Sequence, residues 1–206
     1  MSLTILLIVV TAITSILAWN NPDRLSKWIM NPYQVSRKKE YYRFISSGFI
    51  HNDYMHLIFN MITLYYFGDV IEKIFGYYFG FTGLVYFLAL YFIGMIVADI
   101  PSYLKYRNFS GYNSLGASGA VSAVVFSSIL FNPTTKICLY FAFCIPGFIF
   151  GILYLLYSYY QGRHMADNIN HDAHLYGALF GLVFSIAVYP SVIGKFIDQI
   201  MSFRLF

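Results

Sequence analysis

The chain has 206 residues, of which 59% are hydrophobic and only 11% are charged. Soluble domains carry about 25% charged and about 45–50% apolar residues, so this composition excludes a soluble domain and a disordered chain. Two cysteines are too few for a disulfide scaffold, and long apolar blocks exclude the alternating pattern of a membrane β-barrel. We therefore expect an all-α polytopic membrane protein, folded as a single domain over residues 1–206.

The intervals between charged residues predict six transmembrane helices. A helix needs about 20 apolar residues to cross the hydrocarbon layer, and lipid offers no hydrogen-bond partner to a free backbone group. The first span lacks a basic n-region and a clear cleavage site, so we expect it to be retained. The predicted spans cover residues of about 3–19, 54–74, 77–98, 115–131, 137–158 and 173–190.

Two connecting segments and one cysteine pair carry further expectations. Residues 20–53 mix aromatic and basic side chains, which suit the lipid headgroup layer, so we expect a folded loop in the membrane interface. This segment supplies most of the net charge of +4, which favours contact with the lipid bilayer rather than with nucleic acid. Apolar residues recur at helical spacing within 191–206 and predict a short surface helix. Cys138 and Cys144 lie in the fifth apolar run, where we expect free, buried, small apolar fillers.

Polar residues open three of the predicted spans. In a membrane helix an ionisable or amide side chain is costly and is a functional candidate by default. The second, fourth and sixth spans cross the bilayer in the same direction, so parity places their N-terminal ends on one side at a similar depth. The residues concerned are His51, His56 and Asn60, then Ser118, then His171 and His174.

Small residues predict which of these spans meet. They recur every four residues from Ala173 to Ser185 in the sixth span, and similar spacing occurs in the fourth span. Such spacing lets two helices approach closely, which would bring Ser118 within reach of His174. The glycines expected to pack near the site are Gly116, Gly119, Gly177 and Gly181.

The residue types suit acyl transfer. A serine hydroxyl is a weak nucleophile until an adjacent base takes its proton, and His174 can be that base, because imidazole groups in general titrate near neutral pH. The oxyanion formed by attack needs preplaced donors. The Ser118 N–H group is one candidate, and His56 and Asn60, four residues apart on one helix face, are two more.

Other interpretations of the single residues remain open. A serine between small residues is most often packing filler, and His56 with Asn60 suits a structural hydrogen-bonded pair. The His-Glu-x-x-His pattern of zinc proteases is absent, and we expect neither metal nor cofactor. A transporter would show polar residues along the full depth of several spans, whereas here they gather at one end.

At these residues the chain resembles the rhomboid family of intramembrane serine proteases, over roughly residues 40–190. The matching motifs are His56-x-x-x-Asn60, Gly116-Ala117-Ser118-Gly119, Ala173-His174-x-x-Gly177-x-x-x-Gly181 and Gly68-x-x-x-Glu72. The resemblance implies a six-helix bundle with Ser118 as nucleophile and His174 as general base. It also implies an oxyanion hole of His56, Asn60 and the Ser118 N–H group. Its substrates would be membrane-anchored proteins, cut in or near their transmembrane segment.

Some features depart from the family pattern. Several members carry an aromatic residue four positions after the nucleophile, where this chain has Ser122, and Tyr176 is a candidate to compensate. Asp172, two residues before His174, points away on a helix, so we expect a dyad. An inactive relative that binds transmembrane helices as a scaffold or chaperone is the alternative function.

Two arguments give opposite answers about the side of the membrane to which the site opens. Loops on the active-site side hold nine Lys and Arg residues against four on the other side, and the positive-inside rule would place the nine in the cytoplasm. The family resemblance implies a site that opens to the extracytoplasmic side. We expect the second arrangement, because six of the nine charges lie in the folded segment 20–53.

Overall fold

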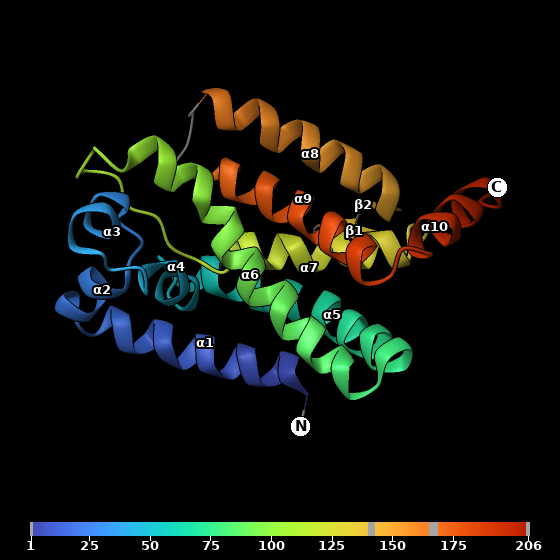
Figure 1. The fold of residues 1–206 in the computed structure, drawn as a ribbon, viewed down its shortest axis with the longest axis horizontal. Helices are drawn as coiled ribbons and strands as arrows, with labels where there is room; N and C mark the ends of the chain where they lie inside the picture. Colours follow the sequence, from blue (N-terminus) through green and yellow to red (C-terminus); the bar gives the residue numbers. More distant parts are fainter. Residues whose placement is uncertain (1, 140–142, 165–168, 205–206) are drawn as a thin grey trace.

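A computed structural model describes residues 2–139, 143–164 and 169–204 of the chain. Helices dominate this part of the protein (Figure 1). The longer ones are α1 (Leu3–Trp19), α5 (Tyr54–Phe79), α6 (Phe81–Tyr106), α7 (Ser118–Phe131), α8 (Gly147–His164), α9 (His171–Val188) and α10 (Val192–Met201). The shorter elements are α2 (Pro22–Trp28), α3 (Pro32–Lys38), α4 (Arg43–Ser46), the 3₁₀ helix η1 (Ser47–Phe49), β1 (Lys136–Leu139) and β2 (Phe143–Pro146).

Helix length and hydropathy identify membrane-spanning candidates. Within the described residues, α6 and α9 are long and apolar enough to cross a membrane, while α1 and α7 are apolar but shorter. Five of the six predicted spans overlap one observed helix each, the third (77–98) overlaps the end of α5 as well as α6, and α10 lies within the predicted surface segment 191–206.

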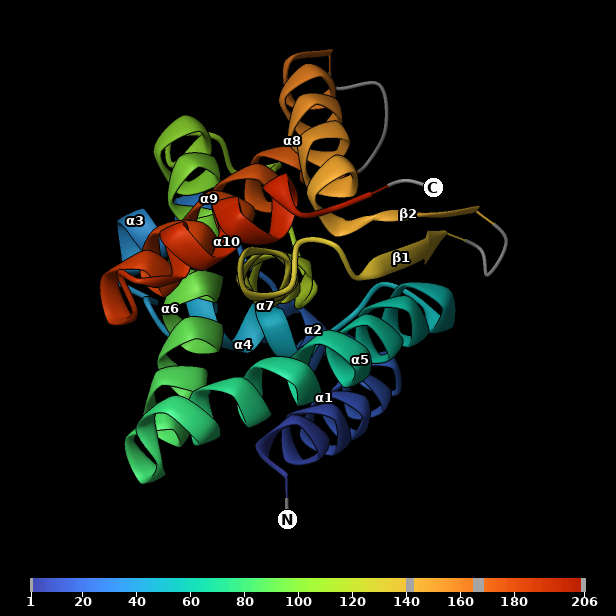
Figure 2. The same cartoon turned by 90° about the vertical axis from the view of Figure 1, so that its right-hand side faces the viewer.

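The central element of the fold is α7. Figure 2 looks along this helix and shows α5, α6, α8 and α9 arranged around it, each in contact with it. Every residue of α7 after Ser118 is buried. Its closest neighbour is α9, because Gly177 and Gly181 present no side chain: a Cβ added at either would lie 2.1 Å from a carbonyl oxygen of α7.

The fifth predicted span is wrong in its first half. We expected a helix over 137–158, but an antiparallel hairpin of β1 and β2 precedes α8, which begins at Gly147. Pro146 lacks an N–H group and disfavours a helical conformation at the residue before it, and the β-branched and aromatic residues before it favour strands.

The two cysteines also differ from expectation. In the hairpin register Cys138 lies opposite Cys144, and the two sulfur atoms form a disulfide. Both residues are exposed. The prediction of free, buried fillers is therefore wrong, because it assumed a continuous helix in which neither side chain would face the other.

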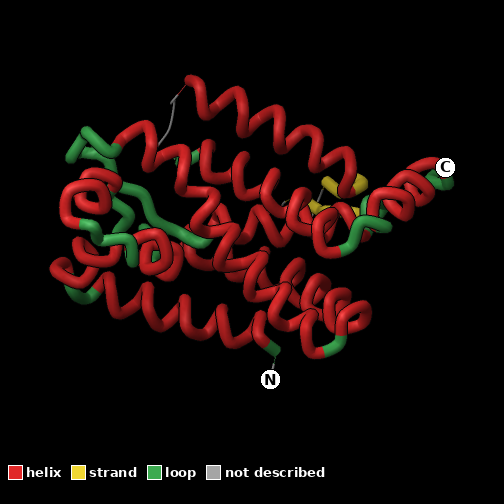
Figure 3. Tube along the Cα trace, viewed as in Figure 1, coloured by secondary structure: helices red, strands yellow, loops and turns green. Residues whose placement is uncertain are grey.

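The segment 20–53 contains three short helices and η1, and it lies at the end of the molecule where most loops gather (Figure 3). Arg43 is buried at its centre, pairs with the Glu40 carboxylate at 2.6 Å and donates to two backbone carbonyl oxygens. A backbone bridge between Met30 and Ser114 joins the segment to the loop that leads into α7.

The motif residue Glu72 ties α1 to α5. Its carboxylate accepts hydrogen bonds from the N–H groups of Leu3 and Thr4 and from the hydroxyls of Ser2 and Thr4, at 2.7–2.9 Å. These are the unsatisfied donors at the start of α1, and a carboxylate at a helix N-terminus also matches the helix dipole. The contact holds α1 along α5.

Candidate active site

Ser118 and His174 meet where α7 and α9 begin. The Nε2 atom of His174 lies 2.9 Å from the Oγ atom of Ser118, although 56 positions separate them in sequence. This distance lies within the range expected of a nucleophile and its general base. The close approach of α7 and α9 at Gly177 makes it possible, since Gly177 lies against the Gly119 carbonyl group.

His56 approaches the same point from α5. Its ring lies against Gly116, where an added Cβ would be 2.6 Å from Cε1 of His56. Gly116 also has a φ of +113°, which glycine adopts without strain. The backbone N–H group of His56 donates to the Asp53 carboxylate at 2.8 Å, and this hydrogen bond lowers the pKa of Asp53. The structure therefore brings His56 to the segment that carries Ser118.

Asn60 lies one turn further along α5 and is buried. Its side-chain amide donates to the His56 carbonyl oxygen at 2.9 Å. An amide group carries two N–H donors, so this bond leaves one of them for another acceptor. The described contacts thus join Asn60 to His56 rather than directly to Ser118.

An aromatic ring from α8 supports the His174 imidazole. Tyr154 stacks on His174 with ring centroids 6.2 Å apart, and its hydroxyl lies 2.7 Å from the Ser122 Oγ atom. Tyr176, the candidate from the sequence, is instead 43% exposed and lines a groove with α6. That expectation is wrong because two residues along a helix turn the side chain by about 200°. The signal in the sequence was the small side chain of Ser122, because it leaves room for an aromatic ring from another helix.

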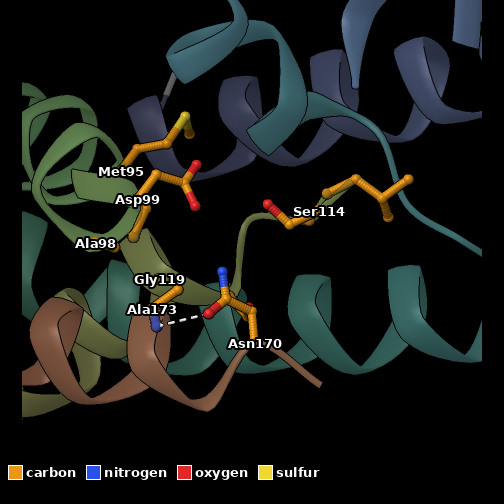
Figure 4. Close-up of a pocket in the computed structure, with 11 residues that line it drawn as sticks. Met95, Ala98, Asp99, Ser114, Gly119, Asn170 and Ala173 are labelled. Carbon is orange, nitrogen blue, oxygen red and sulfur yellow. Dashed lines mark hydrogen bonds between the residues drawn. The ribbon is translucent and has the colours of Figure 1, made fainter. Parts of the chain in front are cut away.

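A small polar cavity lies beside Ser118 (Figure 4). Its volume of about 20 Å³ is room for one water molecule. Asp99 of α6 lines it with Ser114 and Asn170. Within the described part of the chain, the buried Ser114 hydroxyl and Asn170 amide nitrogen have no hydrogen-bond partner.

Asp99 was missed as a site residue because it was used to mark the end of the third span. The helix continues to Tyr106, so this carboxylate lies inside an apolar helix, which is itself a functional signal. Asn170 was missed as well: it caps α9, its side-chain oxygen accepting from the Ala173 N–H group at 3.1 Å. The cap holds the turn that bears His174.

The Asp172 side chain forms a long ion pair with a lysine of α6. The Asp172 carboxylate lies 3.9 Å from the Lys105 ammonium, and the Nε2 atom of His174 faces Ser118. Over residues 2–139, 143–164 and 169–204, no group of three or more His, Cys, Asp or Glu side chains is arranged to hold a metal ion.

A family model described as the Rhomboid domain matches residues 38–191. The chain belongs to the rhomboid family. RHOMBOID-like protein 12, mitochondrial, from Arabidopsis thaliana is 29% identical over 171 residues, which are 74% of this chain and 49% of that protein. Rhomboid protease GlpG from Yersinia pseudotuberculosis serotype I (strain IP32953) is 27% identical over 158 residues, which are 76% of this chain and 51% of that protein.

Rhomboid protease GlpG from Klebsiella pneumoniae (strain 342) is 32% identical over 98 residues, which are 48% of this chain and 32% of that protein. This rhomboid therefore spans about half, or less, of the length of these relatives. The rhomboid match contains Ser118, His174, His56 and Asn60.

Proposed function

We propose that this rhomboid is an intramembrane serine endopeptidase that acts through a Ser118–His174 dyad. The 2.9 Å contact between Oγ and Nε2 carries the proposal. Ser118 attacks the carbonyl carbon of a peptide bond while His174 takes its proton, and His174 then donates that proton to the leaving amine. The Ser118 N–H group, His56 and Asn60 stabilise the oxyanion. These residues supply every group the reaction needs, so it requires no metal or cofactor.

The proposed bundle has six spans: α1, α5, α6, α7, α8 and α9. The 14 residues of α7 reach only about 21 Å, at 1.5 Å per residue, against a hydrocarbon layer of about 30 Å. A central helix this short cannot reach both membrane surfaces, which supports a position of Ser118 below one of them. This depth supports cleavage of membrane-anchored proteins in or near their transmembrane segment, with α8 at the side entrance. The loop that would complete this entrance includes residues 165–168, which lie outside the described residues.

The surrounding contacts suit the two steps of the mechanism. Stacking on Tyr154 restrains the His174 ring, and the Asn170 cap fixes the start of α9. The acyl-enzyme must be hydrolysed by water, and the polar cavity beside Ser118 has room for one molecule. We propose that this cavity, lined by Asp99, supplies it.

We propose further that the site opens to the extracytoplasmic side. The hairpin follows α7, at the end opposite Ser118, so this orientation places Cys138 and Cys144 in the cytoplasm, where thiols are kept reduced. The Cys138–Cys144 disulfide seen in the structure would then be reduced in cells, so we expect both thiols to react with a membrane-permeant maleimide in intact cells without prior reduction. A disulfide found there, together with an inward result from a topology reporter, would support the reverse orientation that the Lys and Arg count favours.

A serine-reactive fluorophosphonate probe and a transmembrane reporter test the activity. The wild type should be labelled and should cleave the reporter, whereas Ser118→Ala and His174→Ala should abolish cleavage and leave the fold intact. Ser128→Ala, a buried serine further along α7, is the matched control and should behave as the wild type. An unlabelled wild type, or cleavage retained by Ser118→Ala, would refute the proposal and leave the inactive transmembrane scaffold.

A further inference from the structure

A third histidine, His51, contacts α1, the residue before Ser118 and the ring of His56. It lies between η1 and α5 and is completely buried. Its Nδ1 atom is 3.1 Å from the Ser15 hydroxyl of α1, and its Nε2 atom accepts from the Ala117 N–H group at 3.3 Å. Ala117 directly precedes Ser118. The His51 ring therefore joins α1 to the backbone that presents the nucleophile.

The hydrogen bonds determine the protonation of this ring. Because the Ala117 N–H group must donate, Nε2 carries a lone pair and Nδ1 carries the proton. The Ser15 Oγ atom accepts a hydrogen bond from this Nδ1–H group and donates in turn to the Phe49 carbonyl oxygen at 3.2 Å. Burial and the neighbouring His56 lower the pKa of His51 to about 3, against a smaller opposing effect of Asp53. The ring is thus neutral at physiological pH, as the Ala117 bond requires.

The same ring also contacts the proposed oxyanion donor. The His51 and His56 rings lie edge to face with centroids 4.9 Å apart, and His56 lies against Gly116. The Gly116 N–H group is held separately by the Ser47 carbonyl oxygen at 2.9 Å. Loss of the His51 ring would therefore release Ala117 on one side and remove the support of His56 on the other.

We propose that His51 is a positioning residue, which holds the Ser118 segment and the His56 ring in register through its two ring nitrogens and its edge contact. The inference deepens the proposed protease function and depends on it. His51 does not touch the substrate in this role, so it acts on the rate of the chemical step rather than on substrate binding.

Paired substitutions of His51 test the hydrogen bond separately from the packing. His51→Gln keeps an acceptor that can reach the Ala117 N–H group, whereas His51→Leu fills similar space and offers none. A misplacement of about 1 Å can cost about 10²-fold in rate. We expect His51→Leu to lower kcat and the rate of fluorophosphonate labelling by about ten- to a hundredfold with KM nearly unchanged, and His51→Gln to recover most of both.

Ser15→Ala tests the inference without altering the ring. It should lower kcat by less than His51→Leu, because the Ala117 N–H group still selects the same tautomer. Ser185→Ala is the matched control, because it removes the buried hydrogen bond from the Ser185 hydroxyl of α9 to the Ser127 hydroxyl of α7, away from the site. It should lower thermal stability to a similar extent and leave kcat at the wild-type value.

The outcomes separate the two proposals. Wild-type kcat in folded His51→Leu, or equal losses in His51→Leu and His51→Gln, would overturn the role of His51 while the protease function stands. If His51→Leu does not fold, wild-type kcat in Ser15→Ala together with a full loss in His51→Gln would overturn it. A wild type without labelling or cleavage would refute the protease function, and this inference with it.

Discussion

Substitution of Gly177 by alanine should separate the dyad by a distance that the structure specifies. The added Cβ would lie 2.1 Å from the Gly119 carbonyl oxygen, and ordinary contact begins near 3.4 Å, so α9 must move by about 1.3 Å. The obstructing atom belongs to the backbone, which cannot change rotamer as a side chain can. The bond between Ser118 and His174 is 2.9 Å long and is lost beyond about 3.5 Å, so it tolerates a shift of only about 0.6 Å.

The expected effect on activity exceeds the effect on folding. Overpacking of this kind typically costs about 1–3 kcal/mol of stability, which a detergent-solubilised bundle should survive as a lowered Tm. A displacement of about 1 Å in a catalytic pair costs about 10²-fold in rate. We therefore expect Gly177→Ala to lower kcat for the transmembrane reporter by about a hundredfold, with a matching loss in the rate of fluorophosphonate labelling.

Gly76→Ala provides the control. Gly76 also lies inside a helix, but no heavy atom lies within 4 Å of an added Cβ. Alanine there should leave kcat unchanged and raise stability by about 0.5–1 kcal/mol, because glycine is the poorer helix former. Wild-type kcat in folded Gly177→Ala would refute the argument that the contact between α7 and α9 sets the dyad distance.

Three further predictions concern residues around the dyad. Asn60→Ala should lower kcat by about 10²-fold, the lower end for loss of one oxyanion donor, and an unchanged kcat would remove it from that role. Tyr154→Leu should lower kcat by about two- to tenfold, since an aromatic contact contributes about 0.5–1.5 kcal/mol; Tyr154→Phe keeps the ring and should lose less, and steady-state kinetics compares the two. Asp53 has a lowered pKa, so its cap on α5 stabilises the fold above the ordinary aspartate pKa of about 3.9 and is lost as the pH falls through the folded value. The difference in Tm between the wild type and Asp53→Ala should therefore shrink in acid, and a difference independent of pH would contradict the cap.

The spacing of charges located the helices better than it located their ends. The first predicted span agrees with α1, whereas the second and third stop short of the observed helices, which continue to Phe79 and Tyr106. Charged residues continue a helix when they find partners: Glu72 caps α1 and Asp69 pairs with Lys73. Such partners come from packing or from the helix itself, so a charged residue does not by itself mark the end of a helix.

The failure in the fifth span has a different cause. Its apolar run is continuous in sequence, but Pro146 prevents a helix from passing through it, and the residues before it pair as β1 and β2. Composition cannot distinguish an apolar helix from an apolar hairpin over so few residues. The same error hid the pairing of Cys138 with Cys144, which depends on strand register.

The sequence by itself determined the class of protein and the rhomboid motifs, because an apolar composition, charge spacing and motif residues are properties of the chain alone. Only the tertiary structure decided the distance between Ser118 and His174, the aromatic ring from Tyr154 and the link from His51 to Ala117. These contacts join helices and loops that are distant in sequence. They follow from how closely glycine lets α7 and α9 approach and from which side chains fill the remaining space, and no local propensity encodes either.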